Sequence, residues 1–192
     1  MADLVLKGST SGETIIRGSA VGTGTVITIP AETGTLRSTV SSGTVLQVVR
    51  YQTGAVATGT TMIPTDDTIP QITEGNEYMT LAITPRSATS KLLIEVVWNG
   101  TSSSVDYLTV ALFQDSIASS LATVASVNGI ASWMVNLVLI HSMISGTTSA
   151  TTFKVRAGGN SGLGTTTFNG SASARKLGGS LASSITIWEV VP

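Results

Sequence analysis

Residues 78–100 read YMTLAITPRSATSKLLIEVVWNG, and this stretch decides the fold class. Apolar residues alternate with polar or small ones in both of its halves, at Met79, Leu81 and Ile83 and again at Leu92, Ile94, Val96 and Trp98. A period of two places alternate side chains on one face of a strand, so each half predicts a β-strand with one apolar face. The pattern returns through most of the later sequence, which predicts an all-β protein.

A turn is expected between these two strands. Pro85 lacks the backbone N–H that a ladder requires, and residues 86–90 supply no core side chain. The dipeptide Asn99-Gly100 favours positive φ angles, so it predicts the end of the second strand.

The charge content of the chain is low. Only 11% of its 192 residues are charged, against roughly 25% in ordinary globular domains. So few charges solvate a monomer's surface poorly, and we expect neighbouring subunits to cover part of it. The net charge is −1, and Arg175-Lys176 forms the only basic cluster. Because neutralising phosphates takes several clustered Lys or Arg side chains, nucleic acid is not expected as a partner.

The sequence also bears on redox chemistry and membranes. It contains no cysteine, which excludes disulfides, a thiolate nucleophile and a zinc site of cysteine type. The first residues lack the basic region and apolar core of a signal peptide. The longest apolar run, residues 133–144, is interrupted by polar residues and is shorter than the roughly 20 residues of a bilayer span. Membrane insertion is therefore not expected.

Residues 1–43 differ from the rest of the chain. They are short apolar bursts separated by Gly, Ser and Thr, too short to enclose a core alone. A flexible linker and hairpins that pair with another chain both remain open, and the regular spacing favours the hairpins. We therefore predict an attachment arm over residues 1–43 and a head domain over residues 44–192. The apolar residues expected to carry the attachment are Leu4, Leu6, Ile15, Ile27 and Ile29.

Several further strands are expected in the head, at residues 45–51, 107–113, 153–157, 165–168 and 183–190. Both faces of residues 107–113 are apolar, as in a strand covered on two sides. Residues 133–144 read as a buried helix or a long strand, and their β-branched residues favour the strand. About eight strands result, enough for two packed sheets. Residues 62–76 carry prolines and acidic residues and predict a loop.

Candidates for chemistry are few. His141 is the only histidine, and no GxSxG elbow accompanies it, so a core or interface histidine is the better reading than a general base. The acids Asp66, Asp67, Glu74 and Glu77 could bind Ca²⁺ through their oxygens. They lack the DxDxDG spacing, so a solvated loop is preferred. No catalytic, cofactor-binding or metal-binding residue is assigned, and an enzyme is not expected.

Two other motifs have ordinary explanations. Residues 158–164 are rich in glycine but lack the Lys-Ser/Thr that follows in a phosphate-binding loop, so they predict a strand connection. Trp98, Trp133 and Trp188 could line a saccharide site. Tryptophan in a sandwich is more often part of the core or of an interface.

The N-terminal sequence GSTSGETIIRGSAVGTGTVITIPAETGTL resembles a short module of bacteriophage tail-fibre and related virion proteins. Four later blocks are similar to the domains that follow such modules: LAITPRSATSKLLIEVVWNG, YLTVALFQD, TTFKVRAGG and SSITIWEV. Those domains in turn resemble the C1q/TNF-like trimeric jelly roll. The resemblance implies an antiparallel jelly-roll-like sandwich, a homotrimer, and a place on the exterior of a phage particle.

Two roles follow from this resemblance. In the first, the head is a tail-fibre tip that binds a host-surface glycan or protein, and the arm binds other virion proteins. Its expected contacts lie in two loops, at Thr101, Ser102, Ser103, Gly159, Asn160 and Ser161. In the second, the chain is a capsid decoration (cement) protein, since no long repetitive shaft separates arm from head. A glycan hydrolase would need a pair of carboxylates, and the acids outside residues 66–77 are isolated.

Overall fold

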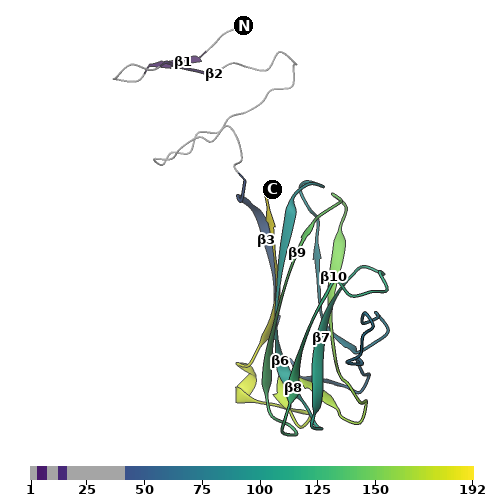
Figure 1. Cartoon of the computed structure of the whole chain (residues 1–192). Coiled ribbons are helices and arrows are strands. Elements are labelled where there is room, and N and C mark those ends of the chain that lie inside the picture. The colour runs from purple at the N-terminus through teal and green to yellow at the C-terminus, as the bar shows by residue number, and fades with distance from the viewer. Residues whose placement is uncertain (1–3, 8–12, 17–41) are drawn as a thin grey trace. The chain divides into compact units, whose positions relative to one another are not determined.

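The computed structural model describes residues 4–7, 13–16 and 42–192 (Figure 1). The chain divides into two units, Met1–Thr39 and Val40–Pro192. In the first, β1 (Leu4–Lys7) pairs antiparallel with β2 (Glu13–Ile16). The role of residues 1–43 as an attachment arm that pairs with another chain stays a prediction. Of the predicted attachment residues, Leu4, Leu6 and Ile15 lie in these strands, and Ile27 and Ile29 lie outside the described residues.

The second unit is a sandwich of two antiparallel sheets. The first sheet consists of β3 (Val45–Thr53), β14 (Ser183–Val190), β6 (Lys91–Ser102) and β9 (Val135–Ile144), with β11 (Thr166–Phe168) and β4 (Ala57–Gly59) beside one end of β6. The second sheet consists of β5 (Asn76–Ile83), β10 (Thr151–Gly159), β7 (Asp106–Gln114) and β8 (Ala122–Asn128). A small hairpin, β12 (Gly170–Ser171) with β13 (Ala174–Arg175), and a 3₁₀ turn, η1 (Leu177–Gly179), precede β14.

The strand order is that of a jelly roll. The last strand, β14, lies between the first strand of the head, β3, and β6, while β10 lies between β5 and β7. Pairing strands so distant in sequence closes the sandwich through two Greek keys. The prediction of an all-β, jelly-roll-like antiparallel sandwich is confirmed. The strands predicted at 78–83 and 92–98 are β5 and β6, which belong to opposite sheets and do not pair.

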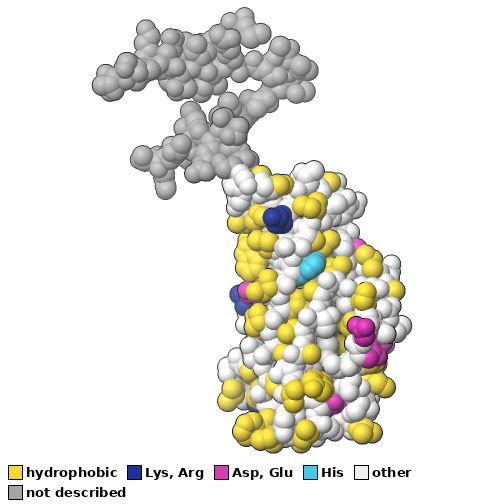
Figure 2. Space-filling view, in the orientation of Figure 1, with side chains coloured by type: hydrophobic (Ala, Val, Ile, Leu, Met, Phe, Trp, Pro, Cys, Tyr) yellow, Lys and Arg dark blue, Asp and Glu magenta, His cyan; other side chains and the backbone are white. Residues whose placement is uncertain are grey.

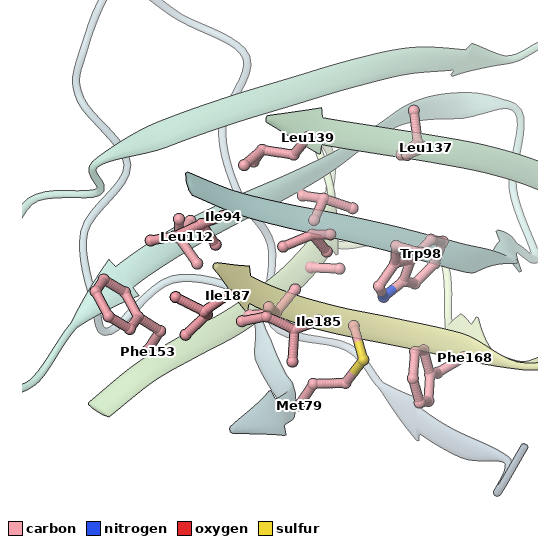
Figure 3. Packing of buried hydrophobic residues seen from close by; sticks show 14 of the residues in the cluster. Met79, Ile94, Trp98, Leu112, Leu137, Leu139, Phe153, Phe168, Ile185 and Ile187 are labelled. Atoms are coloured by element: carbon pink, nitrogen blue, oxygen red, sulfur yellow. The ribbon is translucent and has the colours of Figure 1, made fainter. Parts of the chain in front are cut away.

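The apolar faces predicted from period-two patterns form the core (Figure 3). Leu92, Ile94, Val96 and Trp98 on β6 are all buried, opposite residues of the second sheet such as Leu112 and Phe153. Ile185 and Ile187 of β14 continue this layer, because β14 pairs directly with β6. Removing these side chains from water is the main favourable term that holds the two sheets together.

The prediction that Asn99-Gly100 ends the second strand is wrong. β6 continues to Ser102 because β11 pairs with its last three residues. A Cβ atom on Gly100 would lie 2.3 Å from the carbonyl oxygen of Thr167 on β11. Glycine at this position therefore permits a close approach of two strands, and no turn is formed.

Within the run 133–144, residues Val135–Ile144 form the strand β9, so the strand interpretation is confirmed. β8 was not expected from sequence. Its inward positions include Ser126 and Asn128, which weaken the apolar period, and its strand conformation is set by pairing with β7.

The connection from β5 to β6 is held by a buried carboxylate. Glu189 of β14 accepts hydrogen bonds from the backbone N–H groups of Arg86 (2.8 Å) and Ser87 (3.2 Å). The Ser90 hydroxyl (2.5 Å) and the Gln47 amide (2.6 Å) also donate to it. Burial raises the pKa of Glu189, but these hydrogen bonds outweigh burial and hold the pKa below its ordinary value. The carboxylate thereby fastens the segment that crosses between the sheets.

Candidate functional site

The two loops predicted to bind a partner lie side by side. They are the connections 103–105, between β6 and β7, and 160–165, between β10 and β11, here named the distal loops. Ser103 and Thr165 exchange two hydrogen bonds, of 3.0 and 2.8 Å. Ser161 donates from its backbone and its hydroxyl to Asp106, at 2.9 and 2.8 Å. The distal loops lie at the end of the head opposite Val45, where the chain enters it (Figure 1).

Three of the six residues predicted there are not loop residues. Thr101 and Ser102 are buried as the last two residues of β6, and Gly159 is buried as the last residue of β10. Thr101 and Ser102 are buried because β11 pairs with them. Gly159 is buried because the segment at Ile63 lies against it, where the Ile63 N–H donates to the Gly159 carbonyl (3.0 Å). Ser103, Asn160 and Ser161 keep surface exposure.

Large apolar side chains are exposed around the distal loops. Leu163 is 86% exposed at the tip of one loop, and Val105 is 65% exposed in the other. The neighbouring connection, residues 129–134, carries exposed Trp133 and is tied to the same end by a hydrogen bond from Ser132 N–H to the Ser102 carbonyl (2.8 Å). Exposed apolar side chains gathered in one region are typical of interaction sites. Leu163, within NSGLG, is the sequence signal that could have pointed here.

A second candidate surface is the outer face of the first sheet, here named the bare face. It consists of the outward side chains of β3, β14, β6 and β9, whose neighbours along each strand point into the core. Six of them are apolar and exposed, namely Val45, Val48, Leu93, Val138, Ile140 and Ile144, and polar residues such as Arg50, Lys91 and Glu95 lie between them. Trp188 is half-buried on the same face. Figure 2 shows hydrophobic side chains along the flank that carries β3.

The pairing register gathers apolar side chains of the bare face into two groups, with Arg50, Thr186 and Glu95 in the row between them. Val48, Trp188 and Leu93 lie side by side across three strands, and Val97 lies opposite Val138. Ile140 is 74% exposed beside Glu95. An antiparallel sheet that faces water normally alternates apolar inward and polar outward residues. This outer face departs from that pattern, because six large apolar side chains are exposed on it among the polar ones, and exposed apolar side chains gathered on one face are typical of a surface that a partner covers.

His141 lies in β9 among residues that point toward the core. Its ring is half-buried and forms no hydrogen bond with the residues described in the structure. Burial lowers the pKa of His141 below its ordinary value, so the ring is neutral at pH 7. No serine or carboxylate is arranged with it as a triad within residues 42–192.

Three of the four acids of the 66–77 region form separate interactions. Asp66 accepts hydrogen bonds from Thr68, Glu74 accepts one from the backbone of Gln71 (2.9 Å), and Glu77 pairs with Arg156 at 3.4 Å. In the part of the chain that the structure describes, no group of three or more His, Asp or Glu side chains could hold a metal ion. Nor does that part contain a helix with the length and hydropathy of a membrane span.

The three tryptophans do not form one site. Trp98 is buried in the core, where it packs with Tyr78 and Phe168 at ring-centroid distances of 6.1 and 5.9 Å. Trp188 belongs to the bare face, and Trp133 lies beside the distal loops. A shared saccharide site built from the three indoles is therefore ruled out by their separation.

Comparison with known proteins adds little. No protein-family model matches the sequence, and the search of curated proteins finds no relative. Among solved structures, the chain is similar to the subviral particle of infectious bursal disease virus VP2, with a TM-score of 0.32 and 14% identity. The match covers 87% of this chain and 42% of that one, so this chain spans less than half its length. A functional proposal must come from this chain's own residues and geometry.

Proposed function

We propose that this chain is a non-enzymatic structural protein of the exterior of a bacteriophage particle, where it acts as a homotrimer. Its head binds the host surface as a short tail-fibre tip, and its N-terminal arm binds other virion proteins. The observation that carries the proposal is the bare face, because its exposed Val, Leu and Ile side chains favour cover by a partner such as a second copy of the chain. The sequence resemblance of both the arm and the head to phage virion proteins supports the same role.

The homotrimer is tested by measuring the mass of the purified full-length chain in solution. Light scattering coupled to size-exclusion chromatography should give close to three times the chain mass of 19.6 kDa. A stable monomer across the accessible concentration range would remove the trimer from the proposal.

The arrangement of the head supports the tail-tip role. The chain enters at Val45, and the distal loops lie at the opposite end, as suits a domain held at one end that binds at the other. Leu163→Arg should reduce adsorption of phage particles to host cells without affecting assembly, because Leu163 is exposed and contributes nothing to the core. Thr148→Arg, in an exposed loop at the other end, is the matched control.

A capsid decoration protein is the second candidate. One observation favours it: no long repetitive segment separates the arm hairpin from the head. Copy number per purified particle distinguishes the two roles, measured by quantitative mass spectrometry against the major capsid protein. A few trimers per particle would support the tail tip. A number comparable to that of the capsid protein would identify a cement that stabilises the shell by binding it.

A further inference from the structure

Large apolar side chains project from four separate connections at the end of the head that carries the distal loops. All of them are exposed, and Figure 2 shows hydrophobic side chains at this end. The hairpin of β12 and β13 belongs to the same end, because the Ser171 hydroxyl donates to the Ser132 carbonyl (2.7 Å). The five side chains, here named the distal tips, are Val105, Ile130, Trp133, Leu163 and Leu177.

Connections at the other end of the head differ from the distal tips. Residues 84–90, between β5 and β6, and residues 145–150, between β9 and β10, contain no Val, Leu, Ile, Met or aromatic residue. Ile117 is exposed in a third connection, after β7. Exposed apolar side chains are therefore not a general property of this chain's connections, and their gathering at the distal end is typical of an interaction site.

The backbone at Leu163 and Trp133 is hydrogen-bonded within the loops. The Leu163 N–H donates to the Ser161 hydroxyl (3.4 Å). The Trp133 N–H donates to the Ile130 carbonyl (3.1 Å). A backbone donor that leaves water for lipid must have a partner inside the protein. These two tips meet that condition.

The charges at the distal end favour an anionic surface. Asp106, the acid beside the distal loops, accepts three hydrogen bonds, one from Tyr107 and two from Ser161, so its carboxylate is engaged within the protein. Arg175 and Lys176, the chain's basic cluster, are exposed beside η1. Neither basic side chain forms an ion pair with the residues that the structure describes. Both are therefore available to anionic groups.

Two exposed acids limit the contact to the distal tips. Asp66, with Asp67 beside it, lies against Thr109 and Thr123 on the outer side of the second sheet. These two threonines are inside β7 and β8, back from the distal ends of the strands. Carboxylates at this position repel an anionic surface. Contact is therefore expected through the tips and not through the flank of the second sheet.

These features fit a lipid surface better than a protein partner. The core of a protein interface is a closely packed patch, whereas the distal tips project singly from four connections. Tryptophan, aliphatic side chains and neighbouring basic residues are the composition of segments that lie in a membrane interface. We propose that the distal tips bind an anionic lipid surface. Trp133 and Leu163 insert to head-group depth, and Arg175 and Lys176 bind anionic head groups. The contact needs no segment that crosses the bilayer.

Vesicle binding by the full-length chain tests this inference, which rests on the proposed host-surface role and names the chemistry of that surface. The probes are vesicles of phosphatidylcholine alone and vesicles that contain about one third phosphatidylglycerol, an anionic lipid. Co-sedimentation should show binding to the mixed vesicles and about tenfold weaker binding to the neutral ones. Arg175→Gln combined with Lys176→Gln should remove most of this difference.

A substitution at one tip tests the site. Leu163→Ser should weaken binding to the mixed vesicles about fivefold or more, because it removes apolar surface that would leave water. Ile117→Ser makes a similar change at an exposed position away from the distal tips and is the matched control. It should bind as the wild type does. Neither side chain belongs to the core, so both variants should fold.

Trp133 reports the depth of the contact. Lipids brominated on their acyl chains should quench the tryptophan fluorescence of the wild type. Trp133→Phe should abolish the quenching, because Trp98 is buried in the core. Quenching that persists in Trp133→Phe would place the contact on the bare face, where Trp188 lies, and would overturn the proposed site.

Two further results would overturn the lipid contact. One is that the wild type binds neither kind of vesicle, and the other is that Leu163→Ser and Ile117→Ser bind equally well. Equal binding of the wild type to both vesicles would remove Arg175 and Lys176 from the contact.

The failure of this inference is distinguishable from failure of the tail-tip role. If Leu163→Arg reduces phage adsorption while vesicles stay unbound, the tail-tip role stands and its partner is a protein or a glycan. Vesicle binding combined with a copy number like that of the capsid protein would keep the lipid contact and remove the tail-tip role.

Discussion

The outer faces of the two sheets differ in what covers them. On the second sheet, Ala111 and Phe113 point away from the main core, yet both are fully buried because Ile63 and Ile72 of the 60–75 segment pack on them. On the first sheet, the apolar residues of the bare face have no such cover from the described residues, and Ile140 is 74% exposed. Outward apolar side chains therefore stabilise the fold on the second sheet, whereas on the first sheet they are exposed and available for association.

Whether an apolar outer face is covered within the chain depends on a segment that can lie against it. A long segment of the same chain can cover a sheet only if it lies flat, and Gly158 allows this on the second sheet, because a Cβ atom there would lie 2.5 Å from the carbonyl oxygen of Thr61. Among residues 42–192, the first sheet has no comparable covering segment beyond the small β12–β13 hairpin near the end of β6. An apolar outer strand in a sequence thus predicts cover, but not whether the cover comes from the same chain.

The largest loss of stability is expected from removing a side chain under the 60–75 segment on the second sheet. Phe113→Ala removes a fully buried ring and leaves a cavity under Ile63 and Ile72. It should lower the free energy of unfolding by about 3–5 kcal/mol, measured by urea denaturation. Ile117→Ala, a truncation at a half-exposed position in the following loop, is the control and should cost far less. Equal losses in the two variants would show that the 60–75 segment contributes little packing energy.

An intermediate effect is expected at the connection that joins the two sheets. Glu189→Gln keeps the shape of the side chain but replaces one acceptor oxygen by an NH₂ group that faces donors such as the Arg86 N–H. We expect a loss of about 2–3 kcal/mol, because hydrogen bonds to a charged group are among the stronger ones.

The contribution of Glu189 to stability should depend on pH, and the same variant tests this. The folded-state pKa of Glu189 lies below its ordinary value of 4.5, so the wild type has the full contribution above that pH. It loses the contribution as the pH falls through the lower, folded-state pKa. Glu189→Gln should flatten this acid limb when urea midpoints are compared from pH 7 down to pH 3. Parallel curves for the two proteins would contradict the assignment.

The smallest effect on the fold is expected on the bare face. Ile140→Lys places a charge where the monomer is already exposed, so the folded head should change in stability by only about 0.5 kcal/mol. Association should be weakened strongly, because the charge would be buried between copies. Light scattering should show monomers for Ile140→Lys and trimers for Thr148→Lys, a loop control. A trimer in both would place the contact on another surface.

Sequence patterns predicted the strands better than their partners. The period-two runs at β6, β10 and β14 were predicted almost to their ends, because burial on one face fixes their alternation. The turn at residues 84–90 was predicted too, but local residues cannot specify that it crosses between sheets. Gly100 was misread as a turn residue, since a close approach of β11 depends on tertiary structure.

The candidate surfaces were predicted only in part. The distal loops were identified as polar and glycine-rich connections, but burial of Thr101 and Ser102 depends on β11, more than 60 positions later. The apolar residues Val138, Ile140 and Ile144 of the bare face are visible in the sequence of β9. The sequence alone cannot distinguish them from core residues, because both kinds of position are apolar. The nearness of Arg175-Lys176 to the loop of Trp133 carried no signal, because only the tertiary fold brings these segments together.

The position of β3 has a mechanical consequence. The chain enters the head at this strand, which is paired along its whole length with β14, from Val45 opposite Val190 to Thr53 opposite Ser183. Two more hydrogen bonds, between Gly43 or Thr44 and Val191, continue the ladder at its outer end. A pull on Thr44 that is resisted at the distal loops runs along β3, at right angles to these bonds. The hydrogen bonds between β3 and β14 are therefore loaded in shear and must break together. The strand that connects the head to the N-terminal residues thus also resists mechanical unfolding of the head.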